Sequence, residues 1–520
     1  MRTSGPGTRA ISKVGIAVPR FHVPPRALAN AGWAHGALGT LTLAAIVTGT
    51  PVVLHLAGQG FGIAAGVLLA LLVAKFAAPT VPIALVFSYV FQNLFIALVS
   101  PGVATIDQLN TMRGYNFILT AVVWIVIAAS YWTARDRFDR DLRVIIDVTT
   151  AALVLIGVYF VVGLAANPSG AIVYLRNIVT PILMFQVFAL VTCRHRLSIT
   201  APLIVMALVA LLYGYFECFA HDDLHRLVNG DTYLALRTYE PNMWLKELHE
   251  TGRVIRSYLD TMEVDFLNTP LLADLGLRFY RIVGPNFHSI SYAYALAFFS
   301  IVLFAAGHWW YCLLALPVLL IVGSKGALVL VALVTAATGA LLRLRGSIPL
   351  WVYSAVLLLY VAGGIVTGIQ GQDYHVIGFI GGLKGFIANP IGRGIGVGGN
   401  LSLDMTTIDW NKSQYFGHTD IAVESAVGVV LYQMGIFGAA ILAVFVWIAM
   451  KLWKWYLRSG SRLHATGCFA LLTVTANGIF QEEAIFAPLA LGTVLAFAGL
   501  LLGRAYRTTA AQHVGLRQVR

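Results

Sequence analysis

Apolar runs of about 20 residues recur along this chain and constrain its fold more than any other feature. They begin near Ala37 and continue to Leu502. The hydrocarbon core of a bilayer is about 30 Å thick, so a helix of about 20 apolar residues crosses it. Charged residues make up only 11% of the 520, whereas soluble domains carry about 25%. The sequence therefore predicts an all-α polytopic membrane protein and excludes a row of soluble domains.

These runs predict about fourteen transmembrane helices, with twelve as the lower bound. The predicted spans are 37–57, 60–78, 80–100, 116–133, 144–165, 171–192, 198–219, 288–306, 308–323, 325–343, 349–369, 420–450, 464–481 and 484–503. The four cysteines lie in or at the ends of these spans, and this placement predicts neither a disulfide framework nor a cysteine zinc site.

The distribution of arginine and lysine predicts which side each connection faces. With the basic N-terminus in the cytoplasm and the spans alternating, nearly every basic cluster falls on the cytoplasmic side, as the positive-inside rule requires. These clusters are Arg135 to Arg143, Arg194 with Arg196, Arg343 with Arg345, Lys451 to Arg462, and Arg504 to Arg520. The net charge of +12 therefore reflects membrane orientation, and no nucleic acid is expected as a partner.

This topology divides the chain into seven parts and leaves two long connections outside. The parts are a basic cytoplasmic tail without a signal peptide (1–36), an N-terminal bundle of about seven helices (37–219), a first long outer loop (220–287), helices (288–369), a second, glycine-rich outer loop (370–419), helices (420–503) and a cytoplasmic tail (504–520). Residues 239–263 of the first loop are predicted to form a surface helix or a small helical cap.

The end of the first loop carries a pair of cations just before a helix. Arg278 and Arg281 precede Asn286 and His288, and the next helix is predicted to begin at His288. Arginine forks and the free N–H groups of a helix N-terminus bind phosphate well. The alternative is an anchor in which the arginines contact lipid headgroups at the membrane surface.

Two further outer segments combine cations with small residues. Ser324 and Lys325 form a tight turn between two apolar spans, where a cation breaks the charge trend; it marks a functional site or is a snorkelling lysine. Residues 384–400 include Arg393, Gly394 and Gly396. Their GxGxxG pattern lacks the strand and helix of a dinucleotide fold, so a re-entrant loop lining a polar cavity is the better prediction.

A histidine and a glutamate lie close together at the start of the span 420–450. His418 is predicted to share a helical face with Ile421, Ala422 and Ser425, with Glu424 beside it. This pair predicts proton transfer, or a glutamate that orients the histidine. The alternative is a structural polar cluster that caps the helix.

Two weaker candidates complete the outer face. His221 and His225 have the i, i+4 spacing of metal ligands, but no third ligand is evident in the sequence, and histidine pairs at surfaces are common. Glu482 and Glu483 lie between the last two spans, where they contact substrate or cap the turn.

The ordered set of outer motifs resembles the O-antigen ligase and polysaccharide polymerase superfamily of bacterial inner-membrane proteins. The resemblance covers residues 275–440 and rests on Arg281, Gly284, Pro285 and Asn286; Ser324-Lys325-Gly326; Asn389, Pro390, Gly394 and Gly396; and His418 with Gly435-Ile436-Phe437-Gly438. Lys325 stands where the family has arginine, and Thr419 where it has asparagine. The pair Glu424-Ser425 is more similar to exopolysaccharide polymerases than to lipid A-core ligases.

The resemblance implies a GT-C-like bundle with two long periplasmic loops and a glycosyl transfer that uses neither metal nor cofactor. The donor is an undecaprenyl-diphosphate-linked oligosaccharide in the lipid bilayer of the inner membrane, and the site faces the periplasm. His418 is then the base, with Glu424 as its orienter or an alternative base. The diphosphate is held by Arg278, Arg281, Lys325 and Arg393, and the substrate loops include Asn286, His288, Ser324, Gly394, Gly396 and Ser425.

Three other functions remain open from the sequence. A ligase of the same superfamily transfers the glycan to lipid A-core instead of to another lipid-linked repeat unit. A secondary transporter requires charged residues at the bilayer midplane and broken helices from an internal repeat. The spans contain few charges, with Asp147, Lys75 and Arg176 as the exceptions, and the hydropathy shows no two-fold symmetry. A non-catalytic subunit of an envelope-assembly machine is the third alternative. A chain-length regulator is a further candidate partner of a polymerase.

Overall fold

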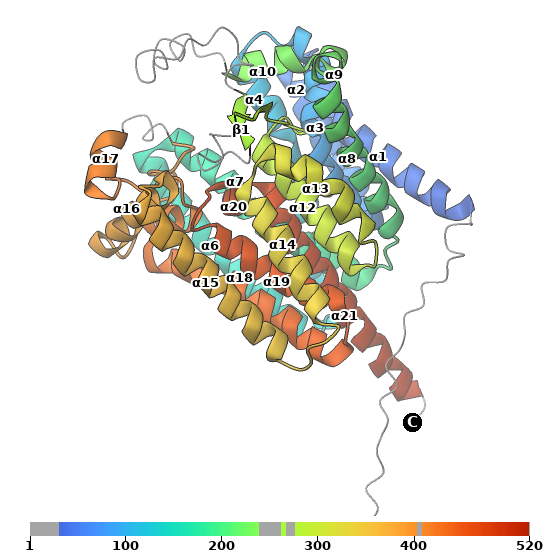
Figure 1. Cartoon of the computed structure of the whole chain (residues 1–520). Helices are drawn as coiled ribbons and strands as arrows, with labels where there is room; N and C mark the ends of the chain where they lie inside the picture. Colours follow the sequence, from blue (N-terminus) through green and yellow to red (C-terminus); the bar gives the residue numbers. More distant parts are fainter. Residues whose placement is uncertain (1–30, 239–261, 267–275, 403–407, 519–520) are drawn as a thin grey trace, which may run out of the picture.

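The computed structural model describes residues 31–238, 262–266, 276–402 and 408–518, and these form an almost entirely helical protein (Figure 1). Ten helical segments are long and apolar enough to span a membrane, and four shorter apolar helices accompany them. One pair of antiparallel strands, β1 (Glu263–Asp265) and β2 (Arg278–Tyr280), is present in the described part of the first long loop. The protein is therefore a helical polytopic membrane protein.

The helices follow the order of the predicted spans, with short helices added between them. In the N-terminal part they are α1 (Ala31–His55), α2 (Gln59–Phe76), α3 (Val81–Val99), α4 (Ile106–Arg113), α5 (Tyr115–Thr133), α6 (Arg140–Ala166), α7 (Pro168–Arg194), α8 (Thr200–Phe219), α9 (His221–Val228) and α10 (Gly230–Thr238). The remainder are α12 (Ser289–Ala305), α13 (Trp310–Val322), α14 (Lys325–Ala340), α15 (Ile348–Gln370), α16 (Tyr374–Ala388), α17 (Trp410–Phe416), α18 (Ala426–Ser459), α19 (Arg462–Asn477), α20 (Glu483–Phe486), a π-helical turn (Pro488–Gly492) and α21 (Thr493–Gln518).

The helices α7 and α21 pack closely against each other, and their membrane-spanning parts are the most buried of the bundle. Two glycines of α21 permit this close approach: a Cβ atom on Gly499 or Gly503 would lie 2.3 Å from a backbone oxygen of α7. Small residues are the usual means by which membrane helices pack closely. In contrast, α15 lies at the edge of the bundle and leaves large apolar side chains such as Trp351 and Leu358 exposed, as a lipid-facing helix does.

Two predictions about the helices are not confirmed, and a third falls almost wholly outside the described residues. The count of fourteen spans is not confirmed, since α13 has 13 residues and a helix of that length extends only about 20 Å. The second outer loop contains the apolar helix α16, because its glycines lie among larger apolar residues. The surface helix predicted for 239–263 lies almost entirely outside the described residues, and its last residue, Glu263, is in strand β1.

Candidate functional site

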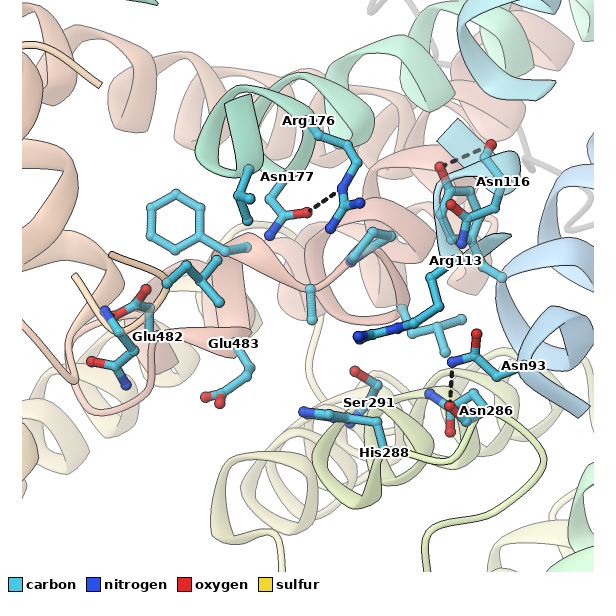
Figure 2. A pocket seen from close by; sticks show the side chains of 18 of the residues that line it. Asn93, Arg113, Asn116, Arg176, Asn177, Asn286, His288, Ser291, Glu482 and Glu483 are labelled. Atoms are coloured by element: carbon cyan, nitrogen blue, oxygen red, sulfur yellow. Dashed lines mark hydrogen bonds between the residues drawn. The ribbon is translucent and has the colours of Figure 1, made fainter. Parts of the chain in front are cut away.

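A polar cavity of about 250 Å³ lies where the ends of α3, α5, α7 and α12 meet the short helices α4, α10 and α20 (Figure 2). The long connections after α8 and α15 border it. The polar residues that line it are Tyr89, Asn93, Arg113, Asn116, Arg176, Asn177, Arg237, Asn286, His288, Ser291, Asn400, Glu482 and Glu483. The predicted topology places these residues at or near the outer side, except Tyr89, which lies midway along a predicted span. We call this cavity the outer pocket.

Three arginines from three different helices line the outer pocket. Arg113 ends α4, Arg176 lies in the first half of α7, and Arg237 is near the end of α10. Their hydrogen bonds go to neutral oxygens: the Nη1 of Arg237 donates to Phe287 O at 2.7 Å, and Arg176 and Arg113 donate to asparagine side chains at 3.4 and 3.3 Å. Within the described parts of the chain, none of these arginines forms an ion pair with a carboxylate.

The positive charge of this cluster destabilises the folded protein, because the three arginines repel one another in a partly buried space. Burial lowers the pKa of Arg237, and the positive charge of Arg113 lowers it further. Figure 2 shows Arg113 extending toward the middle of the pocket, with Arg176 on a neighbouring wall. Uncompensated cations around a cavity are an arrangement suited to an anion that carries more than one negative charge.

His288 forms the floor of the pocket beside Ser291 (Figure 2). It is the N-cap of α12, and its Nδ1 accepts a hydrogen bond from Ser291 N at 3.3 Å. Burial and the neighbouring cations, Arg237, Arg113 and Arg281, lower the pKa of His288 to about 3. The imidazole is therefore neutral near pH 7, with Nδ1 as acceptor and Nε2–H available as a donor.

The two glutamates on the opposite side differ in their surroundings. Glu482 is buried and accepts hydrogen bonds from the Tyr174 hydroxyl and, at 3.0 Å, from Asn400 N. Glu483 faces the pocket (Figure 2), and within the described residues its carboxylate has no ion-pair partner and no hydrogen bond to another residue, only one to its own backbone N–H. Burial, and then the charge of Glu424, raise the pKa of Glu483, while Arg281 opposes this. Glu482 fastens the loop at Asn400 to α7, whereas Glu483 can act on a bound molecule.

The raised pKa of Glu482 predicts how stability depends on pH. Burial raises this pKa from 4.5 to about 8, so the protonated carboxyl favours the folded state. This contribution is present below about pH 4.5 and is lost as the pH rises toward about 8. We expect the thermal midpoint of the wild type, relative to that of Glu482→Gln, to be higher at pH 5 than at pH 8. A difference in midpoint that is constant with pH would contradict this assignment.

The segment before α12 supplies three of the predicted site residues. Asn286 and His288 line the outer pocket, and Asn93 Nδ2 donates to Asn286 O at 2.6 Å. Arg281 does not line the pocket, and its Nε donates to Val322 O at 3.4 Å. Its pKa is lowered by burial and raised in part by Glu483. Arg278 belongs to β2, and its side chain lies outside the described residues.

The turn between α13 and α14 lies next to this segment. Ser324 is the N-cap of α14 and is buried, with an Oγ that has no hydrogen-bond partner among the described residues. Lys325 is the first residue of α14, and its side chain is exposed. Neither residue lines the outer pocket.

The glycine-rich segment after α16 is a packed loop. The Nη1 of Arg393 donates to Gly385 O at 2.9 Å, and its guanidinium lies 4.0 Å from the ring centre of Tyr432. Gly394 and Gly396 have φ values of +100° and +90° and touch the backbones of α6 and α7. The glycines therefore permit contact between chain segments. Only the end of the loop, at Asn400 and Leu401, reaches the outer pocket.

Gly396→Ala is expected to destabilise the protein strongly. A Cβ atom at this position would lie 2.2 Å from Ala171 N, at a φ that L-residues avoid, so the cost is about 3 kcal/mol or more. Gly157→Ala in α6 is the matched control, since a Cβ atom there meets nothing within 4 Å. Thermal unfolding in detergent measures both, and equal midpoints for the two variants would refute a packing role for Gly396.

The helical face predicted around His418 is absent. Residues 417–425 are not helical, because Ser425 caps α18 and the helix begins only at Ala426; Ser425 Oγ accepts from Gly428 N at 3.1 Å. His418 Nδ1 lies 3.2 Å from Thr419 O, and His418 does not line the outer pocket.

Glu424 pairs with a histidine that the sequence did not indicate. Its carboxylate lies 3.2 Å from Nδ1 of His375, in α16. Burial favours neutral forms of both groups, but their mutual attraction outweighs it: the pKa of His375 is raised and that of Glu424 is lowered. Asn400 links this pair to the pocket, because its Oδ1 accepts from Glu424 N at 2.9 Å and its N–H donates to Glu482.

The three arginines of the outer pocket were not among the site residues predicted from the sequence. Only Arg176 carried a signal, since it is a cation inside a predicted span. Arg113 and Arg237 lie at or near the ends of short helices and have no sequence feature that separates them from arginines at a membrane surface.

Fold and site together define a polytopic helical membrane protein with a basic, polar pocket at one end of its bundle. No protein-family model matches this chain, and no sequence among the curated proteins matches it.

Proposed function

We propose that this protein is a membrane glycosyltransferase of the polymerase type. Its donor is a glycan on undecaprenyl diphosphate, and its acceptor is another lipid-linked repeat unit at the periplasmic face of the bacterial inner membrane. The observation that carries the proposal is the set of three arginines around the outer pocket, which form no ion pair in the described structure and share the cavity with Glu483. A diphosphate supplies the charge that these arginines lack, and an acceptor hydroxyl requires a base such as Glu483.

In the proposed reaction, an acceptor hydroxyl attacks the anomeric carbon of the donor sugar. The new C–O bond forms as the bond from that carbon to the diphosphate oxygen breaks, and the electron pair leaves with the diphosphate. Glu483 takes the hydroxyl proton. Arg113, Arg176 and Arg237 stabilise the charge that develops on the leaving group, as positioned cations do in other transfers. The neutral His288 contributes a hydrogen bond through its Nε2–H.

This assignment revises the roles suggested by the resemblance. The resemblance implies His418 as base and Arg278, Arg281, Lys325 and Arg393 as diphosphate ligands. The outer pocket instead supports Glu483 as base and the three arginines as ligands, with Arg281 as a nearby cation that acts on Glu483. His375 and Glu424 then have an indirect role, because they hold Asn400 in position at the edge of the pocket.

The proposal is tested with full-length protein purified in detergent and incubated with an undecaprenyl-diphosphate oligosaccharide. Gel electrophoresis and mass spectrometry should show products lengthened by whole repeat units. If glycan appears only on added lipid A-core, the protein is a ligase and the proposed acceptor, a lipid-linked repeat unit, is wrong. If neither product forms while the donor is unchanged, the proposed transfer is refuted.

A further inference from the structure

Glu217 at the end of α8 lies beside His221 and His225 of α9, and none of these three residues lines the outer pocket. Their ligand atoms all lie within 4.8 Å of one another. The two histidines show the i, i+4 spacing of metal ligands, and the fold adds Glu217 as the third group. We propose that these three residues bind a structural zinc ion.

The distance between two of the ligands matches tetrahedral coordination. His225 Nε2 lies 3.4 Å from Glu217 Oε1, which is long for a charged hydrogen bond. Zinc bonds to nitrogen and carboxylate oxygen are about 2.0–2.1 Å, and a tetrahedral angle between them separates the two ligand atoms by about 3.3 Å. An ion can therefore sit between these atoms with little movement of either residue.

The surrounding carboxylates favour, in both imidazoles, the tautomer that can bind a metal through Nε2. The Nδ1 of His225 lies 3.1 Å from Asp231 Oδ1, and the Nδ1 of His221 lies 3.2 Å from Asp222 Oδ1. A carboxylate at Nδ1 holds the proton on that nitrogen and leaves a lone pair on Nε2, as is usual for histidines that bind zinc. Two imidazoles and one carboxylate form a ligand set that suits zinc, with a fourth position for water.

Glu217, the third ligand, is fully buried, and two backbone N–H groups hold its carboxylate in place. The side chains of His225 and Glu217 are 0% exposed, whereas that of His221 is 18% exposed and open to the outer side. The carboxylate of Glu217 accepts hydrogen bonds from Val283 N at 2.9 Å and Gly284 N at 2.8 Å. The site thus has a preformed inner wall and one outer ligand, His221, whose ring stacks on His225 at 4.0 Å and on Tyr280 at 5.5 Å. In the proposed site the ring of His221 rotates so that its Nε2 reaches the ion.

The ion stabilises the turn that leads into the outer pocket. Val283 and Gly284, which Glu217 binds, come just before Asn286 and His288. A cation on Glu217 and the two histidines fastens α8, α9 and this turn together without taking part in the transfer reaction. Zinc retention and glycan transfer are separate measurements, so either proposal can fail without the other.

The test uses full-length protein purified with an affinity tag that contains no histidine. The protein is stripped with a chelator, incubated with zinc chloride, desalted and analysed for metal by mass spectrometry, and its thermal midpoint is measured with and without zinc. The wild type should retain stoichiometric zinc and unfold at a higher temperature with it. Asp231→Asn should bind zinc about 10-fold more weakly, because it removes only the outer carboxylate.

His221→Ala is the decisive variant, since it removes the ligand that contributes least to packing. It should unfold at the wild-type temperature in the absence of zinc, retain no zinc and show no response to it. His308→Ala, which changes a histidine before α13, is the matched control and should retain zinc. The proposal is overturned if the wild type holds no more zinc than His221→Ala, or if zinc does not change the midpoint of the wild type.

Discussion

Replacing Arg176 with alanine is expected to lower the rate of glycan transfer by about 100-fold or more without destabilising the protein. Loss of one positioned donor to developing charge costs a factor of this size in other enzymes. The carboxylates elsewhere in the described structure do not pair with Arg176, and its side chain donates only to Asn177, at 3.4 Å. Its removal relieves repulsion from Arg113, so the thermal midpoint should stay the same or rise.

The combination of lost activity and retained stability is what distinguishes a ligand-binding arginine from a structural one. A structural arginine would show the opposite pattern, a lower midpoint and nearly normal transfer by the folded fraction. Arg137→Ala, at an exposed position on the predicted cytoplasmic side, is the matched control and should change neither property. If Arg176→Ala transfers glycan at the wild-type rate, the pocket does not bind the diphosphate.

Hydropathy was sufficient to predict where most of the helices lie, because lipid requires long apolar segments wherever a helix crosses. The residues at which helices begin and end were harder to predict from the sequence. Ser425 caps α18 and leaves His418 in a loop, yet the sequence around 420 is apolar enough to suggest a helix that begins earlier. Small helices such as α16 were missed because glycines interrupt their apolar pattern.

The site was only partly predictable from the sequence, because several of its residues come together only through tertiary contacts. Asn286 and His288 were found because they precede a helix, and the signal for this is local. Gly394 and Gly396 have the composition of a ligand-binding loop, but their contacts are with α6 and α7, which lie more than 200 residues earlier. Arg113 and Arg237 become a cluster only when α4 and α10 pack at the ends of α3 and α5.

Replacing Glu483 with glutamine is expected to lower the rate of glycan transfer by about 100-fold to 10,000-fold relative to the wild type, since it removes the general base. Glutamine keeps the size of the side chain and cannot accept the proton of the acceptor hydroxyl. In the wild type the base must be ionised, so transfer should decline as the pH falls through the pKa of Glu483, which burial raises above the usual 4.5. The residual activity of Glu483→Gln should lack this acidic limb.

The same assay compares the two candidate bases directly. His418→Ala should retain transfer, because His418 does not line the outer pocket and its Nδ1 faces the carbonyl of Thr419. Glu482→Gln should mainly affect stability, because that carboxyl is occupied by Tyr174 and Asn400. If His418→Ala abolishes transfer while Glu483→Gln preserves it, the family resemblance identifies the base correctly and the pocket assignment is wrong. The opposite result would place the chemistry at the cavity that Arg113, Arg176 and Arg237 surround.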